Sequence, residues 1–470
     1  MTEGSSTQRS DPGTLVVGLG KTGLSCVRHL RRLGRRVTAV DSRPSPPALA
    51  AVCEEFPEVR VTLGGFPRQA FQDVADIVVS PGVSLAEPAI AQARAARIPV
   101  CGDIELFARA VGATPVVAIT GSNGKSTVTT MVADMLRLDG RRVAVGGNLG
   151  EPALSLLDGE RPQVYVLELS SFQLETTDSL EPRVAALLNL SADHMDRYAD
   201  MEEYARTKAR IFAGRGAMVL NRDDGRVAAM ALERREVVFY TLGVPRAGEF
   251  GLLPGDHGDA LSFGETPILA AEKLMVAGRH NLANGLAAMA IASRLGVCHE
   301  TMARALMDFR GLPHRCQLVA EADGVRWIDD SKATNVGATV AAIAGLAARP
   351  DEVLESRLDS PLDSDKRLIL IAGGDGKGAD FSALAEPLAR YVRLALLIGR
   401  DAGRIAAVAE GVAEVVQADG MADAVEIARA RARPGDSVLL APACASFDMY
   451  TSYEERGDAF AAQVRRVLAS

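Results

Sequence analysis

A chain of 470 residues and 49.6 kDa is long enough for roughly three domains of ordinary size. It is 48% hydrophobic, 24% charged and only 4% aromatic, which excludes global disorder and favours α/β layers over an aromatic-rich all-β fold. The net charge of −8 argues against a nucleic-acid partner, because nucleic-acid-binding proteins carry a basic surface.

Cysteine spacing, the N-terminal residues and the length of the apolar runs indicate the cellular compartment of the protein. The six cysteines show no CxxC spacing, which is typical of a reduced protein. Residues 1–13 are polar, without the apolar segment of a signal peptide, and we expect them to form a mobile tail. No apolar run reaches the ~18 residues of a membrane span. We therefore predict a cytoplasmic protein and expect it to be monomeric.

The first block, residues 14–110, alternates short apolar runs with helical stretches. The runs 15–20, 36–41 and 75–83 predict strands, and the amphipathic stretch 22–34 predicts a helix between the first two. Strands separated by helices favour a parallel, doubly wound sheet.

The first strand leads into the pattern Gly18-x-Gly20-x-x-Gly23, and Asp41 ends the next strand. Glycines permit a tight turn and a close approach to pyrophosphate, which the following helix N-terminus attracts. Three interpretations remain open at this point. The pattern fits a nicotinamide-dependent dehydrogenase, a Rossmann-like domain for another nucleotide diphosphate, or a structural turn.

The second block, residues 111–311, opens on an apolar strand followed by Thr120-Gly-Ser-Asn-Gly-Lys-Ser-Thr127 and a helix. Backbone amides of such a loop can surround phosphate oxygens, while Lys125 neutralises charge and Ser126 binds Mg²⁺. Ile119 stands where the strict phosphate-loop pattern has its first glycine. Three further strands and a helical run over 280–311 complete the block.

Acidic and imidazole side chains follow two of these strands. Glu168 ends the strand in VYVLELS, and Asp193, His194 and Asp196 follow the strand in LLNLSADHMDRY. An acidic group after a strand of a phosphate-loop domain usually contacts the metal. Within this cluster, we interpret His194 as a ligand rather than a core histidine.

The third block, residues 312–470, repeats the pattern of apolar strands followed by Gly, Asp, Ser or Lys. The polar stretch 349–366 has no clear period, and we predict an exposed insertion there. In open α/β sheets, ligands lie at the carboxyl ends of the strands. All three blocks therefore predict α/β domains with ligand loops at one sheet edge.

Nine segments resemble the Mur ligases of peptidoglycan precursor assembly, in the same order along residues 14–466. They are TGSNGKST (120–127), GGNLG (146–150), LELSSFQLE (167–175), ADHMDRY (192–198), HNLANGLAA (280–288), GLPHR (311–315), DDSKATN (329–335), GGDGKGADF (373–381) and PACASFD (442–448). The resemblance implies a Rossmann-like domain at 14–110, a P-loop ATPase-like domain at 111–311 and a second Rossmann-like domain at 312–470, which closes on ATP. It also implies ATP-dependent addition of D-glutamate to UDP-N-acetylmuramoyl-L-alanine through an acyl phosphate, and it favours UDP over NAD in the first domain.

The resemblance further implies the site residues. For the UDP substrate they are Leu19, Lys21, Thr22, Asp41, Ser42, Arg43, Ser80, Gly82, Asn148, Ser170 and Gln173. For ATP they are Gly121, Ser122, Asn123, Gly124, Lys125, Ser126, Thr127, Asn281, Asn284, Arg315 and Asp330. For D-glutamate they are Thr334, Lys377, Ser446 and Tyr453. The implied catalytic groups are Lys125, Glu168, His194, Lys208 and Lys332, with Mg²⁺ held by Ser126, Glu168, His194 and a carbamylated Lys208.

Lys208 shares one predicted helix face with four apolar residues, Met201, Tyr204, Ile211 and Phe212. Spacing alone leaves two interpretations: its charged end reaches solvent, or its amine is partly buried. Burial lowers the pKa of a lysine, and only the neutral amine reacts with CO₂. The resemblance implies the second interpretation and a carbamate at Lys208 beside His194.

Overall fold

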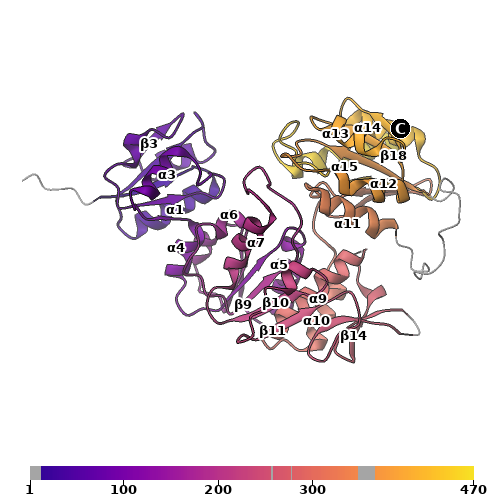
Figure 1. The fold of residues 1–470 in the computed structure, drawn as a ribbon, viewed down its shortest axis with the longest axis horizontal. Helices are drawn as coiled ribbons and strands as arrows, with labels where there is room; N and C mark the ends of the chain where they lie inside the picture. Colours follow the sequence, from indigo (N-terminus) through magenta and orange to yellow (C-terminus); the bar gives the residue numbers. More distant parts are fainter. Residues whose placement is uncertain (1–11, 256–257, 277, 348–365, 470) are drawn as a thin grey trace, which may run out of the picture.

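The computed structural model describes residues 12–255, 258–276, 278–347 and 366–469. The chain forms three α/β domains, with the N-terminal and C-terminal domains on either side of the central one (Figure 1). The predicted α/β class is therefore confirmed. Most of the predicted tail at 1–13 and of the predicted insertion at 349–366 lies outside the described residues.

The N-terminal domain is a five-stranded sheet in the order β3-β2-β1-β4-β5, parallel throughout. Its strands are β1 (Thr14–Val17), β2 (Val37–Asp41), β3 (Arg60–Leu63), β4 (Asp76–Val79) and β5 (Val100–Cys101), and its helices are α1 (Lys21–Arg32), α2 (Leu49–Glu55) and α3 (Pro88–Ala95). The turn after β1 requires glycine at two points. Gly18 has φ +92°, and a Cβ on Gly23 would lie 1.9 Å from the Gly18 carbonyl oxygen. The predicted strands and helix are confirmed, with shorter strands than expected.

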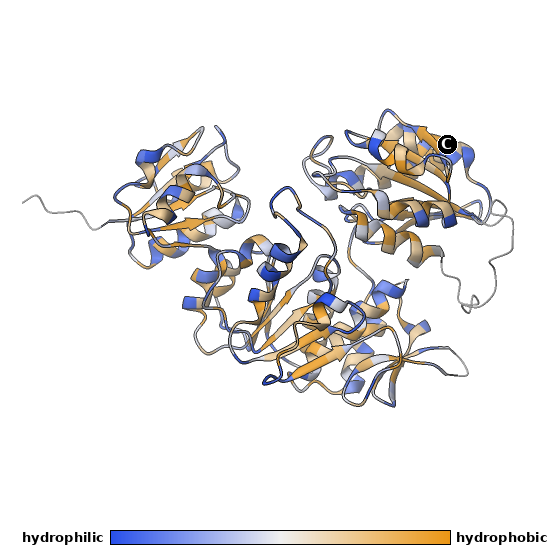
Figure 2. Cartoon of the chain, in the orientation of Figure 1, coloured by the Kyte–Doolittle hydropathy of each residue, from blue (hydrophilic) through white to orange (hydrophobic). Residues whose placement is uncertain are grey.

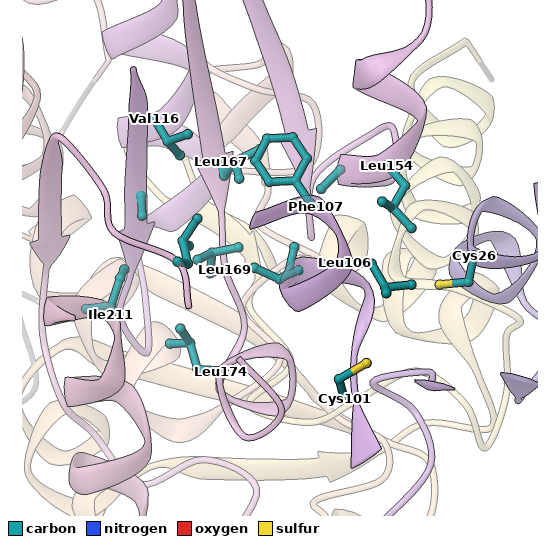
Figure 3. Close-up of a cluster of buried hydrophobic side chains, with 14 of the residues drawn as sticks. Cys26, Cys101, Leu106, Phe107, Val116, Leu154, Leu167, Leu169, Leu174 and Ile211 are labelled. Carbon is teal, nitrogen blue, oxygen red and sulfur yellow. The ribbon is translucent and has the colours of Figure 1, made fainter. Parts of the chain in front are cut away.

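Helix α4 (Asp103–Ala110) follows β5 and packs against the central domain. Leu106 and Phe107 join a buried cluster that extends from Cys26 in α1 to Leu154 and Leu167 of the central domain (Figure 3). The Phe107 ring meets Tyr165 edge-on, with 5.2 Å between centroids. The N-terminal domain is thus fixed to the central domain by a continuous apolar core.

The central sheet has nine strands in the order β14-β13-β12-β11-β10-β9-β6-β8-β7. They are β6 (Val116–Thr120), β7 (Val143–Gly147), β8 (Val164–Glu168), β9 (Val184–Leu187), β10 (Ala217–Asn221), β11 (Val237–Tyr240), β12 (Phe250–Leu253), β13 (Ala260–Phe263) and β14 (Thr266–Ala270). The last three form an antiparallel edge. The sequence analysis expected only β6 to β9 and did not identify β10 to β14. Gly251 in β12 and Pro267 in β14 interrupt the apolar runs by which strands are recognised.

The helices of the central domain carry much of the candidate site. They are α5 (Lys125–Leu138), α6 (Ser171–Leu174), α7 (Met201–Ala209), α8 (Gly225–Ala228), α9 (Arg279–Ser293) and α10 (His299–Asp308). Helices α5, α9 and α10 share one buried cluster with the sheet. The helical run predicted over 280–311 is confirmed as two helices.

The C-terminal sheet has six strands in the order β15-β16-β20-β17-β18-β19 and is parallel except for β15. Its elements are β15 (Gln317–Ala322), β16 (Val325–Asp329), α11 (Val336–Ala347), β17 (Leu368–Gly373), α12 (Ala385–Tyr391), β18 (Val392–Ile398), α13 (Ala402–Ala409), β19 (Glu414–Gln417), α14 (Met421–Arg431), β20 (Ser437–Leu440) and α15 (Tyr453–Ala469). In each domain the strands are largely apolar and the outer helix faces are polar (Figure 2). Within the described ranges, no helix combines the length and apolar character needed to cross a membrane.

A fully buried arginine ties the last helix to the C-terminal sheet. Arg456 in α15 donates from Nε to Ser331 Oγ at 3.0 Å and from Nη2 to the Ser331 carbonyl at 2.8 Å. Its Nη1 donates to the Cys444 carbonyl at 3.1 Å. Burial lowers the pKa of Arg456 to about 10, so the guanidinium stays charged at neutral pH. It therefore holds together the loops that follow β16 and β20.

We predict that Arg456→Leu destabilises the C-terminal domain by about 2–5 kcal/mol, because two buried carbonyl groups lose their donors. Urea denaturation followed by circular dichroism measures the change. Arg466→Leu is the control on the same helix, since Arg466 forms an exposed pair with Glu426 and should change stability little. Equal effects of the two substitutions would contradict this account.

Candidate active site

The loop between β6 and α5 has the form of a phosphate-binding loop. Gly124 precedes the helix with φ +80°, and a Cβ there would lie 2.4 Å from Asn284 Oδ1 in α9. Only glycine therefore fits this position. Lys125 turns back over the loop, and its Nζ donates to the carbonyls of Gly121 and Ser122, both at 2.9 Å. The predicted ATP residues of this loop thus form one compact turn at the carboxyl edge of the central sheet.

A buried carboxylate faces this loop from the next strand. Glu168 at the end of β8 is 2% exposed, and its Oε2 accepts the Ser126 hydroxyl at 2.6 Å. Its Oε1 accepts Asn148 Nδ2 at 2.7 Å. Burial opposes ionisation, but the Lys125 charge and the two hydrogen bonds hold the pKa of Glu168 below its usual value. The site therefore contains a buried anion beside the expected position of phosphate.

Ser126 and Glu168 fit a magnesium site of the kind found with nucleotides. Mg²⁺ is usually bound by one or two protein oxygens, with water and substrate phosphates completing its shell. Among the residues that the structure describes, no group of three or more His, Cys, Asp and Glu side chains is arranged to hold a metal by itself. Arg315 Nη2, from the start of the C-terminal domain, donates to Ser126 Oγ at 2.7 Å. The third domain thus reaches the predicted metal ligands directly.

Asp193 is the meeting point of loops from two domains. Asn335 Nδ2 of the C-terminal domain donates to Asp193 Oδ2 at 3.2 Å and to Asn123 Oδ1 of the phosphate loop at 3.1 Å. Lys377 Nζ lies 3.7 Å from Asp193 Oδ1. These contacts bring the segments DSKATN and GGDGKGADF to the phosphate loop. The sequence analysis did not select Asn335, although it lies in one of the segments that carry the resemblance.

His194 is held in a neutral form next to this carboxylate. Its Nε2 lies 3.6 Å from Asp193 Oδ2, and its ring packs on Phe172 with 4.6 Å between centroids. Burial is the main cause that lowers the pKa of His194 to about 4, with Lys377 and Lys125 adding to it and Asp193 opposing it. Neutral imidazole is the form that binds metals. The predicted ligand role therefore fits the chemistry of this position.

Lys208 lies beneath the phosphate loop. It is 2% exposed, and its Nζ donates to the Gly121 carbonyl at 3.0 Å and to Thr120 Oγ1 at 3.3 Å. Burial holds the pKa of this amine well below its usual value. The interpretation in which its charged end reaches solvent is wrong, because packing of α7 on the central sheet encloses the side chain. Its polar contacts run to β6 and the phosphate loop rather than to His194.

The C-terminal domain adds a further lysine, Lys332, which packs on Tyr453, and a buried acid, Asp330. Lys332 Nζ lies 3.8 Å from the centroid of the Tyr453 ring, and burial together with Arg315 lowers the pKa of Lys332 to about 8. Asp330 is buried and accepts the Cys316 thiol at 3.5 Å. Burial raises the pKa of Asp330 to about 6, against the opposing charge of Arg315.

The predicted D-glutamate residues lie in neighbouring loops of this domain. The loop containing Lys377 is joined to the loop containing Ser446 by two backbone hydrogen bonds between Asp375 and Ala445, at 2.8 and 3.0 Å. Thr334 lies in the loop after β16. Ser446 is 2% exposed. The structure therefore gathers these residues along the carboxyl ends of β16, β17 and β20.

The predicted UDP residues gather at the carboxyl edge of the N-terminal sheet. Asp41 Oδ2 accepts the Leu19 amide at 2.7 Å, and the same carboxylate pairs with Arg43. Ser80 Oγ donates to the Gly18 carbonyl at 2.8 Å. Burial opposes ionisation, but the hydrogen bonds from Arg43 and the Leu19 amide lower the pKa of Asp41 to about 2. Lys21 and Thr22 begin α1 beside this group, while Ser42 and Gly82 are exposed.

Gln173 has a different environment from that expected of a substrate contact. It is 2% exposed, and it forms a capping box with Ser170 at the start of α6. Its Nε2 donates to Asp103 Oδ2 in α4 at 3.1 Å. Gln173 thus joins the N-terminal and central domains, and its contact with the UDP substrate stays a prediction.

Three protein-family models match the chain in order. The Mur ligase MurD-like N-terminal domain matches residues 13–102, the Mur ligase middle domain matches residues 119–292, and the Mur ligase glutamate ligase domain matches residues 314–444. These matches follow the three domains of the fold.

Several proteins named UDP-N-acetylmuramoylalanine--D-glutamate ligase are similar over nearly the full length. The protein of Nitrosococcus oceani is 50% identical over 97% of both chains. The protein of Pseudomonas aeruginosa is 46% identical over 97% of this chain and 99% of its own. Among solved structures, a MurF ligase of Thermotoga maritima in complex with ADP shares the fold, with a TM-score of 0.61, 17% identity and coverage of 97% and 96% of the two chains.

We predict that the Asp41 carboxylate stabilises the N-terminal domain by about 2 kcal/mol at neutral pH, from its lowered pKa. Because its folded pKa lies below the unfolded value, this stability is present above about pH 4 and is lost as the pH falls towards 2. The melting-temperature difference between wild type and Asp41→Asn should therefore shrink from pH 7 to pH 3. Glu58→Gln, which removes an exposed partner of Arg31 in the same domain, is the control. A difference that stays constant over this range would contradict the prediction.

Proposed function

Because the chain belongs to the Mur ligase family, we propose that it joins D-glutamate to UDP-N-acetylmuramoyl-L-alanine with consumption of ATP, in peptidoglycan precursor synthesis. The observation that carries this proposal is the 50% identity over 97% of both chains with a D-glutamate ligase. The geometry supports it, since Arg315, Asn335 and Lys377 of the third domain meet the phosphate loop and its neighbour Asp193. We place the reaction in the cytoplasm and expect the enzyme to act as a monomer.

The reaction needs ATP because a carboxylate oxygen is a poor leaving group. The γ-phosphoryl group passes from ATP to the carboxylate of the UDP substrate, which gives an acyl phosphate and ADP. The neutral amine of D-glutamate then attacks the acyl carbon, phosphate leaves as the amide bond forms, and the nitrogen gives up one proton and keeps the other as the amide N–H. Phosphoryl transfer depends mainly on positioning and charge neutralisation.

The central domain, with a few side chains of the third domain, positions the phosphates and neutralises their charge. The loop amides and Lys125 bind the phosphates, and Lys332 approaches the γ-phosphate from the third domain. Ser126 and Glu168 would hold one Mg²⁺, and His194 with a carbamate on Lys208 would hold a second, which together neutralise phosphate charge. Asn281, Asn284, Arg315 and Asp330 complete the nucleotide site.

The outer domains hold the two substrates that are joined. The residues around Asp41 and Ser80 bind UDP, and Asn148 lies towards the reacting end, where it donates to Glu168. D-Glutamate carries two carboxylates, so its site requires cationic and hydroxyl donors, which Lys377, Thr334 and Ser446 provide beside Tyr453. Closure of the third domain on ATP brings the amine to the acyl phosphate.

The test is phosphate release from ATP with UDP-N-acetylmuramoyl-L-alanine and one amino acid at a time. We expect release with D-glutamate and none with L-glutamate, L-alanine or diamino acids. Lys125→Ala should abolish release but keep UDP-substrate binding, because the two nucleotides occupy different domains. Release with another amino acid in place of D-glutamate would overturn the proposal.

We predict that Lys377→Ala raises the KM for D-glutamate by about 10- to 100-fold and changes the KM for ATP much less. A lysine that faces a substrate carboxylate contributes a charge-assisted hydrogen bond of about 1.5–3 kcal/mol. Steady-state kinetics with each substrate varied in turn measures the effect. Lys366→Ala is the control, since Lys366 donates to the Val412 carbonyl in the same domain. An unchanged KM for D-glutamate would remove Lys377 from the site.

We predict that Lys208 reacts with CO₂ to form a carbamate, because burial holds the pKa of its amine well below the usual value and only the neutral amine reacts. ¹³C NMR of the protein equilibrated with ¹³CO₂ should show a carbamate resonance that Lys208→Ala lacks and Lys366→Ala keeps. Turnover should fall at least about 100-fold in Lys208→Ala if the carbamate stabilises the transferring phosphoryl group. A spectrum with no such resonance, or undiminished turnover in Lys208→Ala, would contradict the prediction.

A further inference from the structure

Arg197 is a largely buried arginine of the ADHMDRY segment that has no part in the reaction described above. Its side chain is 13% exposed. Nη1 donates to the Pro81 carbonyl at 3.0 Å, and Nη2 donates to the Val83 carbonyl at 3.2 Å. Both carbonyls belong to the N-terminal domain, in the loop after β4 that contains Gly82 and follows Ser80. A side chain of the central domain thus holds the loop proposed to bind the UDP substrate.

The same side chain packs on the group that supports His194. The guanidinium carbon of Arg197 lies 4.0 Å from the centroid of the Phe172 ring, and His194 packs on the same ring with 4.6 Å between centroids. The Arg197 amide also donates to the His194 carbonyl at 2.9 Å, which closes the turn that carries the imidazole. His194 occupies this turn with φ +58°. A shift of Arg197 would therefore move His194 through both its backbone and its ring contact.

Glu175 connects Arg197 to the phosphate loop by a second route. It accepts Arg197 Nη2 at 2.8 Å and the Tyr198 hydroxyl at 2.6 Å. The Tyr198 ring packs on Tyr204 at 5.2 Å, and the Tyr204 hydroxyl lies 3.2 Å from Ser122 Oγ. Packed side chains therefore form a continuous path from the substrate loop to the phosphate loop.

Arginine is the side chain that suits this position. Its planar group presents several donors in fixed directions and stacks on an aromatic face at the same time. Arg197 donates hydrogen bonds to two carbonyls and one carboxylate, and its guanidinium stacks on the Phe172 ring. Lysine would keep the charge but could not hold both carbonyls and Glu175 in the same geometry.

We propose that Arg197 is a positioning residue that couples the substrate loop Ser80–Val83 to the His194 turn, so that the UDP substrate and the ATP–Mg²⁺ complex bind cooperatively. This inference rests on the proposed function. Binding of the UDP substrate restricts the movement of the Pro81 and Val83 carbonyls. Because these carbonyls accept hydrogen bonds from Arg197, its guanidinium is restricted in turn, and with it Phe172 and His194. By linkage, nucleotide must strengthen substrate binding by the same factor as substrate strengthens nucleotide binding.

Isothermal titration calorimetry tests the coupling without turnover. The Kd for UDP-N-acetylmuramoyl-L-alanine is measured with and without a saturating non-hydrolysable ATP analogue and Mg²⁺. We expect the two values to differ by at least about fivefold in the wild type and to agree in Arg197→Met. Arg206→Met, an exposed arginine on α7, is the matched control and should keep the wild-type ratio.

Two outcomes would overturn the inference: a wild-type ratio of one, or a wild-type ratio kept in a folded Arg197→Met protein. A merely structural role would lower the melting temperature and leave the ratio unchanged. Should Arg197→Met not fold, Arg197→Lys and Glu175→Gln carry the test, and each should reduce the ratio. Failure of the proposed function is distinguishable, because it shows as substrate binding without D-glutamate-dependent phosphate release.

Discussion

The buried carboxylate of Glu168 is the group around which the phosphate site is built. Its pKa stays below the usual value despite burial because Lys125, Ser126 and Asn148 stabilise its charge, with a further contribution from Arg315. Each of the first three partners has a second role: Lys125 shapes the phosphate loop, Ser126 receives Arg315 from the third domain, and Asn148 is the residue proposed to contact the UDP substrate. Removal of the charge would therefore disturb all three parts of the site at once.

The site is shared between domains, and polar contacts cross both junctions. Arg315 and Asn335 reach the central domain from one side, and Arg197 reaches the N-terminal domain from the other. The junction of the central domain with the N-terminal domain contains more apolar contact than the part of its junction with the C-terminal domain that lies at the phosphate site. The N-terminal domain shares a continuous core with the central domain through α4, whereas the third domain meets the phosphate loop and Asp193 through hydrogen bonds and one ion pair. Polar contacts of this kind can separate without loss of a large apolar surface, which suits the domain proposed to close on ATP.

Elements with long apolar runs and clear turn residues were predicted well. The strands before the two glycine loops, the helix over 22–34 and the helices over 280–311 form as expected, because each contains its own period and its own stop residues. The antiparallel edge of β12, β13 and β14 was missed. Its strands have four or five residues, as do those before the glycine loops, but they contain Gly251, Ser262 and Pro267, which interrupt the apolar runs.

The sequence by itself determined the groups whose chemistry is local. The phosphate loop, the acid that ends β8 and the lysine on an apolar helix face are each recognisable within about ten residues, since a loop and its adjoining strand or helix fold together. Only the tertiary structure decided which groups from different domains meet. Arg315 and Ser126 are 189 residues apart, Asn335 and Asp193 are 142 apart, and Arg197 and Pro81 are 116 apart. Such pairs leave no periodic pattern in the chain, because their distance in space is set by the packing of whole domains rather than by local backbone geometry.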